Sequence, residues 1–230
     1  MEKLGYVLRA NMFRESIALF DEYYRRMYSR MVEGFNRALG CEARRRLVQL
    51  EFILERVKLL ENLATQTFAR HDQAFMKCVQ GIIERGIEPK DAVLPEDVQI
   101  TPEELALYDR AEFEMELLTE SFYYLAGRLR TIIRHPSEPL PGLRGFECRS
   151  IRDVRNKLLE HAEGRDSQVY TQSFGWGGAQ GPVLKSIREA GLETVFPDRG
   201  LYENARELQD SLKRVLGNAI SQRGDSTTEP

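Results

Sequence analysis

The stretch Thr101–Ile132, TPEELALYDRAEFEMELLTESFYYLAGRLRTI, determines the fold class. Its first four residues predict a helix start, because a threonine cap, a proline at the first helical position and a glutamate three residues after the cap suit a first turn. Apolar residues then recur every three or four positions at Ala111, Met115, Leu118, Phe122, Leu125, Leu129 and Ile132. This spacing places them on one face, so we predict a long helix packed against a core.

Two further helices are predicted before this stretch. Residues 11–39 carry an apolar stripe, and Gly40 is expected to end that helix. Residues 42–85 carry a second stripe, with one break allowed, and Gly86 is expected to end it. Runs of this length are typical of a helical hairpin or a coiled-coil-like pair.

The chain beyond residue 135 is predicted to contain shorter elements. A second capping pattern, Ser150-Ile151-Arg152-Asp153, starts a short helix that runs to about residue 163. The glycine-rich segment that follows predicts a loop or a small hairpin of residues 169–176 against 183–186. A last helix is expected from about Asp198.

These elements together predict an all-α bundle of about five helices, two of them long, with the glycine-rich loop or small hairpin before the last helix. Residues 1–220 are expected to form a single domain, and residues 221–230 a polar, flexible tail. The two long striped helices offer more apolar surface than one bundle covers, so we expect a homodimer.

The composition excludes several classes of protein. The 33 Lys and Arg against 36 Asp and Glu give a net charge of −3, too little positive charge for a non-specific nucleic-acid coat. The three cysteines show no CxxC spacing, and the three histidines form no metal-binding motif, so neither a metal nor another cofactor is expected. The sequence has no apolar run of membrane-spanning length and no signal-peptide core, which predicts a cytoplasmic protein without membrane contact.

The segment Ile151-Arg-Asp-Val-Arg-Asn-Lys-Leu-Leu-Glu-His161 carries residues suited to RNA chemistry. It brings Arg155, Asn156 and His161 into one short helix. A histidine exchanges protons near neutral pH, and an arginine holds phosphate oxygens through two parallel hydrogen bonds. On an ideal helix Arg155 and His161 point about 120° apart, so they share a site only if the last turn is loosened or the arginine swings round.

This segment resembles the motif of the HEPN superfamily, in which an arginine is followed by Asn, Asp or His and then by a histidine four to six residues beyond the arginine. The resemblance implies a helical bundle in which two subunits pair and both motifs meet in one cleft. It implies a metal-independent endoribonuclease that leaves a 2′,3′-cyclic phosphate and a 5′-hydroxyl, with Arg155 as transition-state clamp, Asn156 as orienting residue and His161 as general acid or base. Many members are toxins, some with an inhibitor protein, or act in antiviral defence. Others are binding modules without activity.

The charge around this segment favours RNA as the ligand. Residues 127–157 hold eight Lys and Arg against three Asp and Glu, a local charge of +5. We expect the RNA-binding residues to be Arg149, Arg152 and Lys157, with Trp176 stacking on a base. A solvated linker would show the same charge pattern, and Trp176 could instead pin its loop onto the core.

Three functions therefore stay open from the sequence. The first is the endoribonuclease, and the second is a non-catalytic helical module that binds RNA or a protein partner through the same groove. The third is a dimeric scaffold, in which Val154, Leu158 and Ala162 form a core stripe that Arg155 and His161 flank in solvent.

Overall fold

The computed structural model describes residues 13–31, 35–86, 100–135, 140–162, 168–172, 182–187, 193–195 and 200–221. The elements in this part are α2 (Arg14–Met27), the 3₁₀ turn η1 (Tyr28–Arg30), α3 (Phe35–Glu84), α4 (Pro102–Ile133), α5 (Arg149–Ala162), β1 (Gln168–Gln172), β2 (Val183–Ile187), β3 (Glu193–Val195) and α6 (Leu201–Ser221). The predicted helical bundle with two long helices is confirmed, and a small sheet accompanies it.

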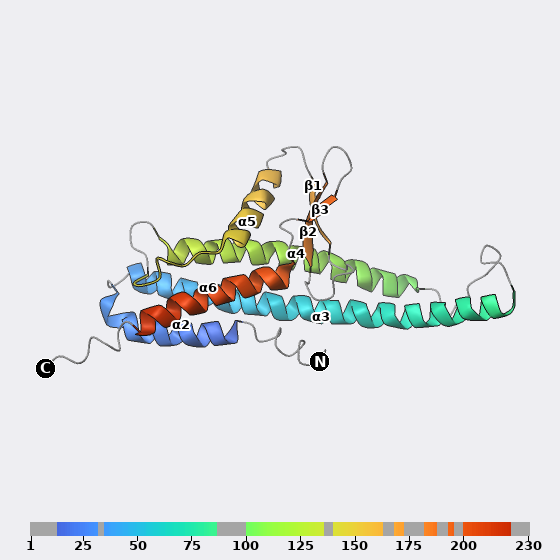
Figure 1. The fold of residues 1–230 in the computed structure, drawn as a ribbon, viewed down its shortest axis with the longest axis horizontal. Helices are drawn as coiled ribbons and strands as arrows, with labels where there is room; N and C mark the ends of the chain where they lie inside the picture. Colours follow the sequence, from blue (N-terminus) through green and yellow to red (C-terminus); the bar gives the residue numbers. More distant parts are fainter. Residues whose placement is uncertain are drawn as a thin grey trace.

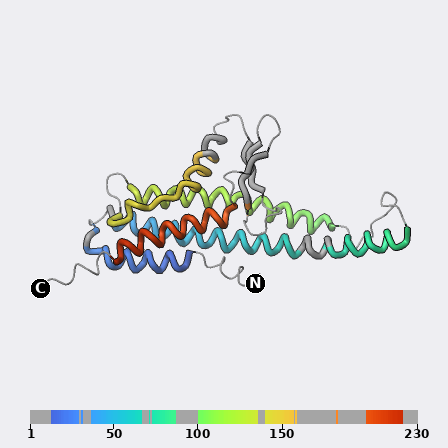
Figure 2. The backbone as a smooth tube through the Cα atoms, in the orientation of Figure 1, coloured from blue at the N-terminus to red at the C-terminus, as the bar shows by residue number. Residues whose placement is uncertain are grey.

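The bundle is built on the α3–α4 pair (Figure 1). α3 runs along most of the molecule, and α4 lies beside it in the opposite direction. α2 and α6 lie along one half of this pair, and α5 rises from α4 next to the sheet. The other half of the pair, at the end where α3 finishes and α4 begins, extends beyond the remaining helices (Figure 2).

The start of α4 has the capping box that its sequence predicts. Thr101 Oγ1 accepts a hydrogen bond from the Glu104 backbone N–H at 3.1 Å, and the Glu104 carboxylate accepts one from the Thr101 N–H at 3.1 Å. Glu104 also lies 3.1 Å from His71 Nε2 on α3. The same glutamate therefore completes the N-terminal cap of α4 and links α4 to α3 through His71.

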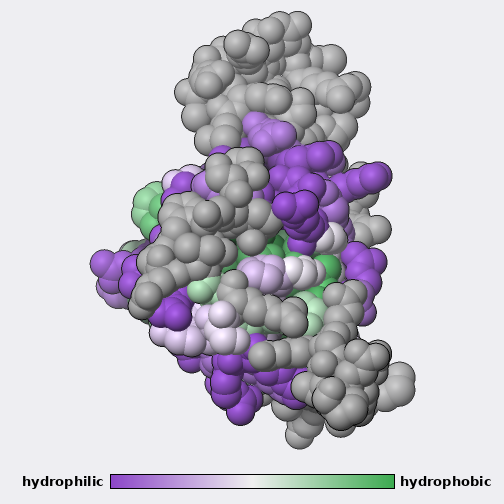
Figure 3. Space-filling model, turned by 90° about the vertical axis from the view of Figure 1, so that its left-hand side faces the viewer, coloured by the Kyte–Doolittle hydropathy of each residue, from purple (hydrophilic) through white to green (hydrophobic). Residues whose placement is uncertain are grey.

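The core contains the apolar faces of all the described α-helices together with the loop between α4 and α5. Three tyrosines are buried in it, and each hydroxyl has a partner: Tyr23 donates to the Pro141 carbonyl at 2.7 Å, Tyr202 donates to Glu61, and Tyr123 accepts from Asn204 at 2.8 Å. Seen end-on, the described surface shows hydrophobic side chains near its middle with hydrophilic side chains around them (Figure 3). Buried, bonded hydroxyls of this kind fix which helices face each other.

The predicted helix over residues 11–39 is wrong, because α2 ends at Met27 and α3 begins at Phe35. α3 then continues through Gly40, which does not end a helix. A methyl group on Gly40 would lie 2.3 Å from Cε2 of Tyr24, so the glycine is there to let α2 and α3 approach each other. The optional break within residues 42–85 is absent from α3 as described.

Of the predicted loop or small hairpin of residues 169–176 against 183–186, the hairpin is confirmed over residues 169–172, where β1 and β2 pair antiparallel from Gln168↔Ile187 to Gln172↔Val183. Residues 173–176 lie outside the described residues. β3 adds a third strand that the sequence did not predict, with Lys185 opposite Val195. The last helix begins at Leu201, whose N–H donates to the Pro182 carbonyl at 2.9 Å, rather than at Asp198. Ser221, predicted as the start of the tail, is the last residue of α6, and residues 222–230 lie outside the described residues.

Candidate functional site

The helix that carries the candidate site, α5, is held against α6 at its beginning. The predicted capping role of Ser150 is not what the structure shows, since the helix already includes Arg149 and Ser150. The Ser150 hydroxyl donates instead to the Glu207 carboxylate of α6 at 2.7 Å. Cys148, just before α5, is buried and also lies near Glu207, and burial together with this carboxylate raises the pKa of its thiol to about 11. A thiol of this pKa stays protonated and is a poor nucleophile.

Arg155 packs across a notch in α4. A methyl group at Gly127 would lie 2.3 Å from Arg155 Cδ and 3.0 Å from its Nε, so only glycine admits the arginine at this position. The side chain is half-buried, and its Nε is fully buried with no hydrogen-bond acceptor in the part of the chain that the structure describes. A guanidinium whose aliphatic stem is packed in place, and whose Nε–H has no acceptor, is able to bind the anion of a ligand.

The other two residues of the motif lie on the same unbroken helix. Asn156 is exposed, and the backbone of His161 belongs to α5, whose last residue is Ala162. The side chain of His161 lies outside the described part. Since α5 stays helical to Ala162, the directions of Arg155 and His161 differ by about 120°, with a rise of about 9 Å between them. Within one protomer, the continuous helix α5 therefore directs Arg155 and His161 to different sides.

The predicted RNA-binding residues have different surroundings. Arg149 is exposed, and Arg152 is exposed but lies 3.1 Å from the carboxylate of Asp153. Lys157 belongs to α5, with its side chain outside the described part, and Trp176 falls outside the described residues altogether.

Part of the positive charge around α5 is neutralised within the chain. Glu147 forms ion pairs with Arg134 and, at 3.6 Å, with Arg130, both from the last turns of α4. Arg128, Arg144 and Arg149 are exposed, and no ion pair is found for them in the described part. The cations available to a ligand are therefore fewer than the sequence count suggests.

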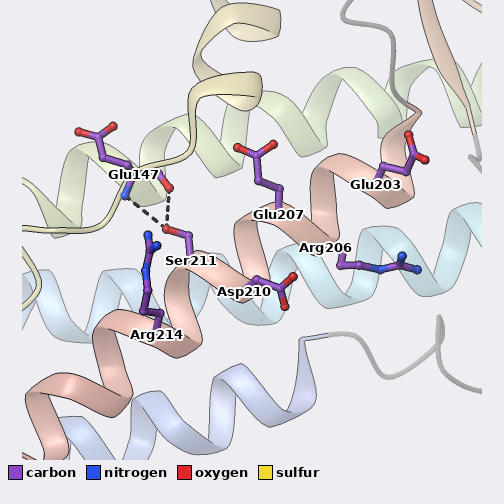
Figure 4. Close-up of a pocket in the computed structure, with 7 residues that line it drawn as sticks. All are labelled: Glu147, Glu203, Arg206, Glu207, Asp210, Ser211 and Arg214. Carbon is purple, nitrogen blue, oxygen red and sulfur yellow. Dashed lines mark hydrogen bonds between the residues drawn. The ribbon is translucent and has the colours of Figure 1, made fainter.

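A second concave region, not predicted from the sequence, lies along α6 (Figure 4). It is a groove of about 680 Å³ lined by Glu147, Glu203, Arg206, Glu207, Asp210, Ser211 and Arg214. Ser211 joins its two walls by donating to the Glu147 carbonyl at 2.5 Å. Four carboxylates and two guanidinium groups line the groove, and one of the carboxylates, Glu147, is already paired with Arg134 and Arg130. The remaining three carboxylates against two guanidinium groups make the groove slightly acidic, which disfavours a phosphate ligand. The signal in the sequence was the run of charged residues on one face of α6.

Comparisons with known proteins return no relatives: no protein-family model, no curated protein and no solved structure matches the chain. No group of three or more possible metal-binding side chains occurs among the described residues. In that same part of the chain, none of the helices has the length and apolar character needed to cross a membrane.

Proposed function

We propose that the chain is a HEPN-like, metal-independent endoribonuclease in which Arg155 holds the scissile phosphate and His161 moves the proton. The observation that supports it is the Arg155 side chain, fixed over Gly127 with its Nε buried and without an internal acceptor. A pre-positioned guanidinium stabilises the charge that builds on a phosphate in the transition state.

In the proposed reaction the 2′-hydroxyl of the RNA attacks the adjacent phosphorus as it loses its proton to a base. The bond from phosphorus to the 5′-oxygen breaks, and that oxygen takes up a proton. The products are a 2′,3′-cyclic phosphate and a 5′-hydroxyl, with no water consumed. Imidazole suits both proton transfers, and a homodimer would supply two copies of His161.

The geometry of α5 also supports an alternative, a non-catalytic module that binds RNA or a protein partner. Because Arg155 and His161 diverge by about 120° on a continuous helix, catalysis requires either residues from different protomers or an arginine side chain that swings round, whereas binding requires Arg155 alone. Toxin and antiviral roles, an inhibitor protein and a cytoplasmic location remain expectations of the resemblance and the sequence.

The test is to incubate the purified chain with labelled RNA in EDTA. Cleavage to cyclic-phosphate ends is expected, and Arg155→Ala or His161→Ala should each lower its rate about a hundredfold or more. Arg85→Ala is the control, an exposed arginine just after α3 and outside the basic segment.

Mixing the two inactive variants distinguishes a shared cleft from a site within one protomer. If each site combines Arg155 of one subunit with His161 of the other, exchange of subunits restores about a quarter of the activity. RNA binding that depends on Arg155, without cleavage, would favour the binding module. Neither cleavage nor binding would reject both functions.

A further inference from the structure

α3 exposes an apolar stripe along its outer side. Val48, Phe52, Leu59 and Leu63 are each about half exposed, Phe52 by 62%. At 100° per residue these four side chains fall within about 60° of one another on the helix. The buried residues of the same stretch, such as Leu50 and Leu54, point the opposite way. The stripe has the four- and seven-residue spacing of a helix that packs against another helix.

α4 carries a matching stripe. Phe113, Leu117 and Tyr124 are exposed, Phe113 by 67%, and lie within about 40° of one another. The buried Met115 and Phe122 again point to the opposite side. Exposed apolar side chains of this size at regular spacing on two neighbouring helices mark an interaction surface rather than scattered surface residues.

The two stripes belong to one face of the α3–α4 pair. Arg56 and Glu114 join the helices through two hydrogen bonds of 2.6 and 2.9 Å, and helical geometry places the stripes on either side of this ion pair. α6 reaches both long helices from the other side, where it contacts Glu61 and Tyr123. We call the side with the two stripes the outer face.

The size of the outer face is close to what a dimer requires. Seven large side chains that are about half exposed leave on the order of 700 Å² of surface, given the area such side chains bury. Stable complexes bury about 800 Å² per partner, and a typical monomer exposes no apolar patch beyond about 600 Å². Four of the charges that border the stripes are already paired, Arg56 with Glu114, and Glu55 with Arg14 at 2.9 Å, so burial would not leave these four unpaired. Glu120 and Arg128, exposed on the same side of α4, have no ion pair among the described residues.

The α3 stripe and the Phe113–Leu117 part of the α4 stripe are centred on the same level of the molecule, and Tyr124 lies beyond it. Val48 and Leu63, like Phe52 and Leu59, are equally far from the midpoint between residues 55 and 56. Phe113 and Leu117 are equally far from residue 115. The Arg56–Glu114 pair shows that the two midpoints lie side by side. A two-fold axis across the helices at this level brings the α3 stripe onto its copy and Phe113 opposite Leu117 of the copy, as a symmetric interface requires, with Tyr124 opposite Ala106.

We propose that the outer face binds a second copy of this chain, with α3 against α3 and α4 against α4, each pair antiparallel. Phe52 then lies opposite Leu59 of the other copy. This proposed interface is independent of the proposed ribonuclease activity. Gly127 is twelve residues from residue 115, the level of the two-fold axis, so the two Arg155 sites lie about 36 Å apart along the helices. A cleft shared by two α5 helices is thus a separate contact, and either contact can fail alone.

Sedimentation equilibrium of the full chain tests the proposal. The wild type is expected to associate through the outer face at tens of micromolar, as a dimer, or as a larger assembly where the separate α5 contact forms too. Phe113→Glu should raise the dissociation constant about a hundredfold or more, because each substitution buries two charges in a symmetric interface. Ile83→Glu, on α3 but off the stripe and 65% exposed, is the control and should leave the dimer unchanged. Circular dichroism confirms that each variant is folded.

Disulfide cross-linking tests the register in a Cys41→Ser background, which removes the exposed native thiol. Mixed Phe52→Cys and Leu59→Cys chains should cross-link, because the antiparallel register brings these positions together. Phe52→Cys mixed with Ile83→Cys should not. A monomeric wild type, or a dimer that Phe113→Glu leaves intact, would overturn the proposal. So would a dimer in which Leu59→Cys links to Phe113→Cys instead.

Discussion

At two places in the molecule, which we call corners, a glycine in one helix lets a side chain of the neighbouring helix pack against its backbone. At the α2–α3 corner, Gly40 makes room for the ring of Tyr24, and at the α4–α5 corner, Gly127 makes room for Arg155. In both, a methyl group on the glycine would lie 2.3 Å from the incoming side chain. Glycine weakens a helix by up to about 1 kcal/mol, so each close approach must compensate for that loss.

The corners differ in what the inserted side chain finds. The Tyr24 hydroxyl donates to the Arg37 carbonyl at 3.3 Å and lies 3.7 Å from Cys41 Sγ, and burial raises the pKa of Tyr24 to about 12. Arg155 brings a buried Nε that finds no acceptor in the described part of the chain. The first corner is therefore closed by its own groups, whereas the second has a donor left for a ligand.

The largest effect is expected from Gly127→Ala, on the binding or cleavage of RNA. The methyl group displaces Arg155, whose flexible side chain can swing away, so affinity or cleavage should fall about tenfold to a hundredfold while the fold persists. In an Arg155→Ala background the same substitution should have no further effect on RNA, which a double-mutant cycle measures. Equal losses in both backgrounds would show that Gly127 acts by another route.

Gly40→Ala should lower the free energy of unfolding by about 1–2 kcal/mol, because the clash with the packed Tyr24 ring exceeds the gain in helix propensity. Gly81→Ala is the matched control on the same helix. A methyl group there would meet only Arg85 Nη2, at 3.9 Å among the described residues, so stability should rise by about 0.5–1 kcal/mol. Urea denaturation measures the free energy of unfolding of both variants. Equal changes in the two would show that Gly40 is not needed for the close approach of Tyr24.

Glu51 makes a smaller, pH-dependent contribution at the closed corner. This buried carboxylate accepts from the Phe13 N–H at 2.7 Å, and burial raises its pKa. The folded state then binds the proton more tightly than the unfolded state, so wild-type stability falls as pH rises above the unfolded pKa. Glu51→Gln keeps an acceptor without the charge and should lose less stability between about pH 4 and pH 7. Urea titrations of the wild type and the variant across this range measure how the free energy of unfolding depends on pH. The same dependence in both proteins would contradict the burial effect.

The periodic helices and one strand pairing could be predicted from sequence, but the corners could not. The stripe through Met27, Met31 and Phe35 keeps its spacing across the turn between α2 and α3, so periodicity alone runs through a break. The local signals Thr101–Glu104 and the glycine-flanked strands of the hairpin correctly predicted their elements. Gly127 gives no such signal, since its purpose depends on Arg155, twenty-eight positions away, and on how two helices cross.

The smallest effect is expected from Tyr24→Phe, which separates the ring from the hydroxyl at the closed corner. The ring fills the space over Gly40 and stays in the variant, whereas the part-buried bond to the Arg37 carbonyl is lost. A loss of about 0.5–1 kcal/mol is expected, less than for Gly40→Ala. Combining the two substitutions should give nearly additive losses, because the phenylalanine ring meets the new methyl group just as the tyrosine ring does. A cost for Tyr24→Phe above that of Gly40→Ala would mean that the hydroxyl, not the ring, holds α2 on α3.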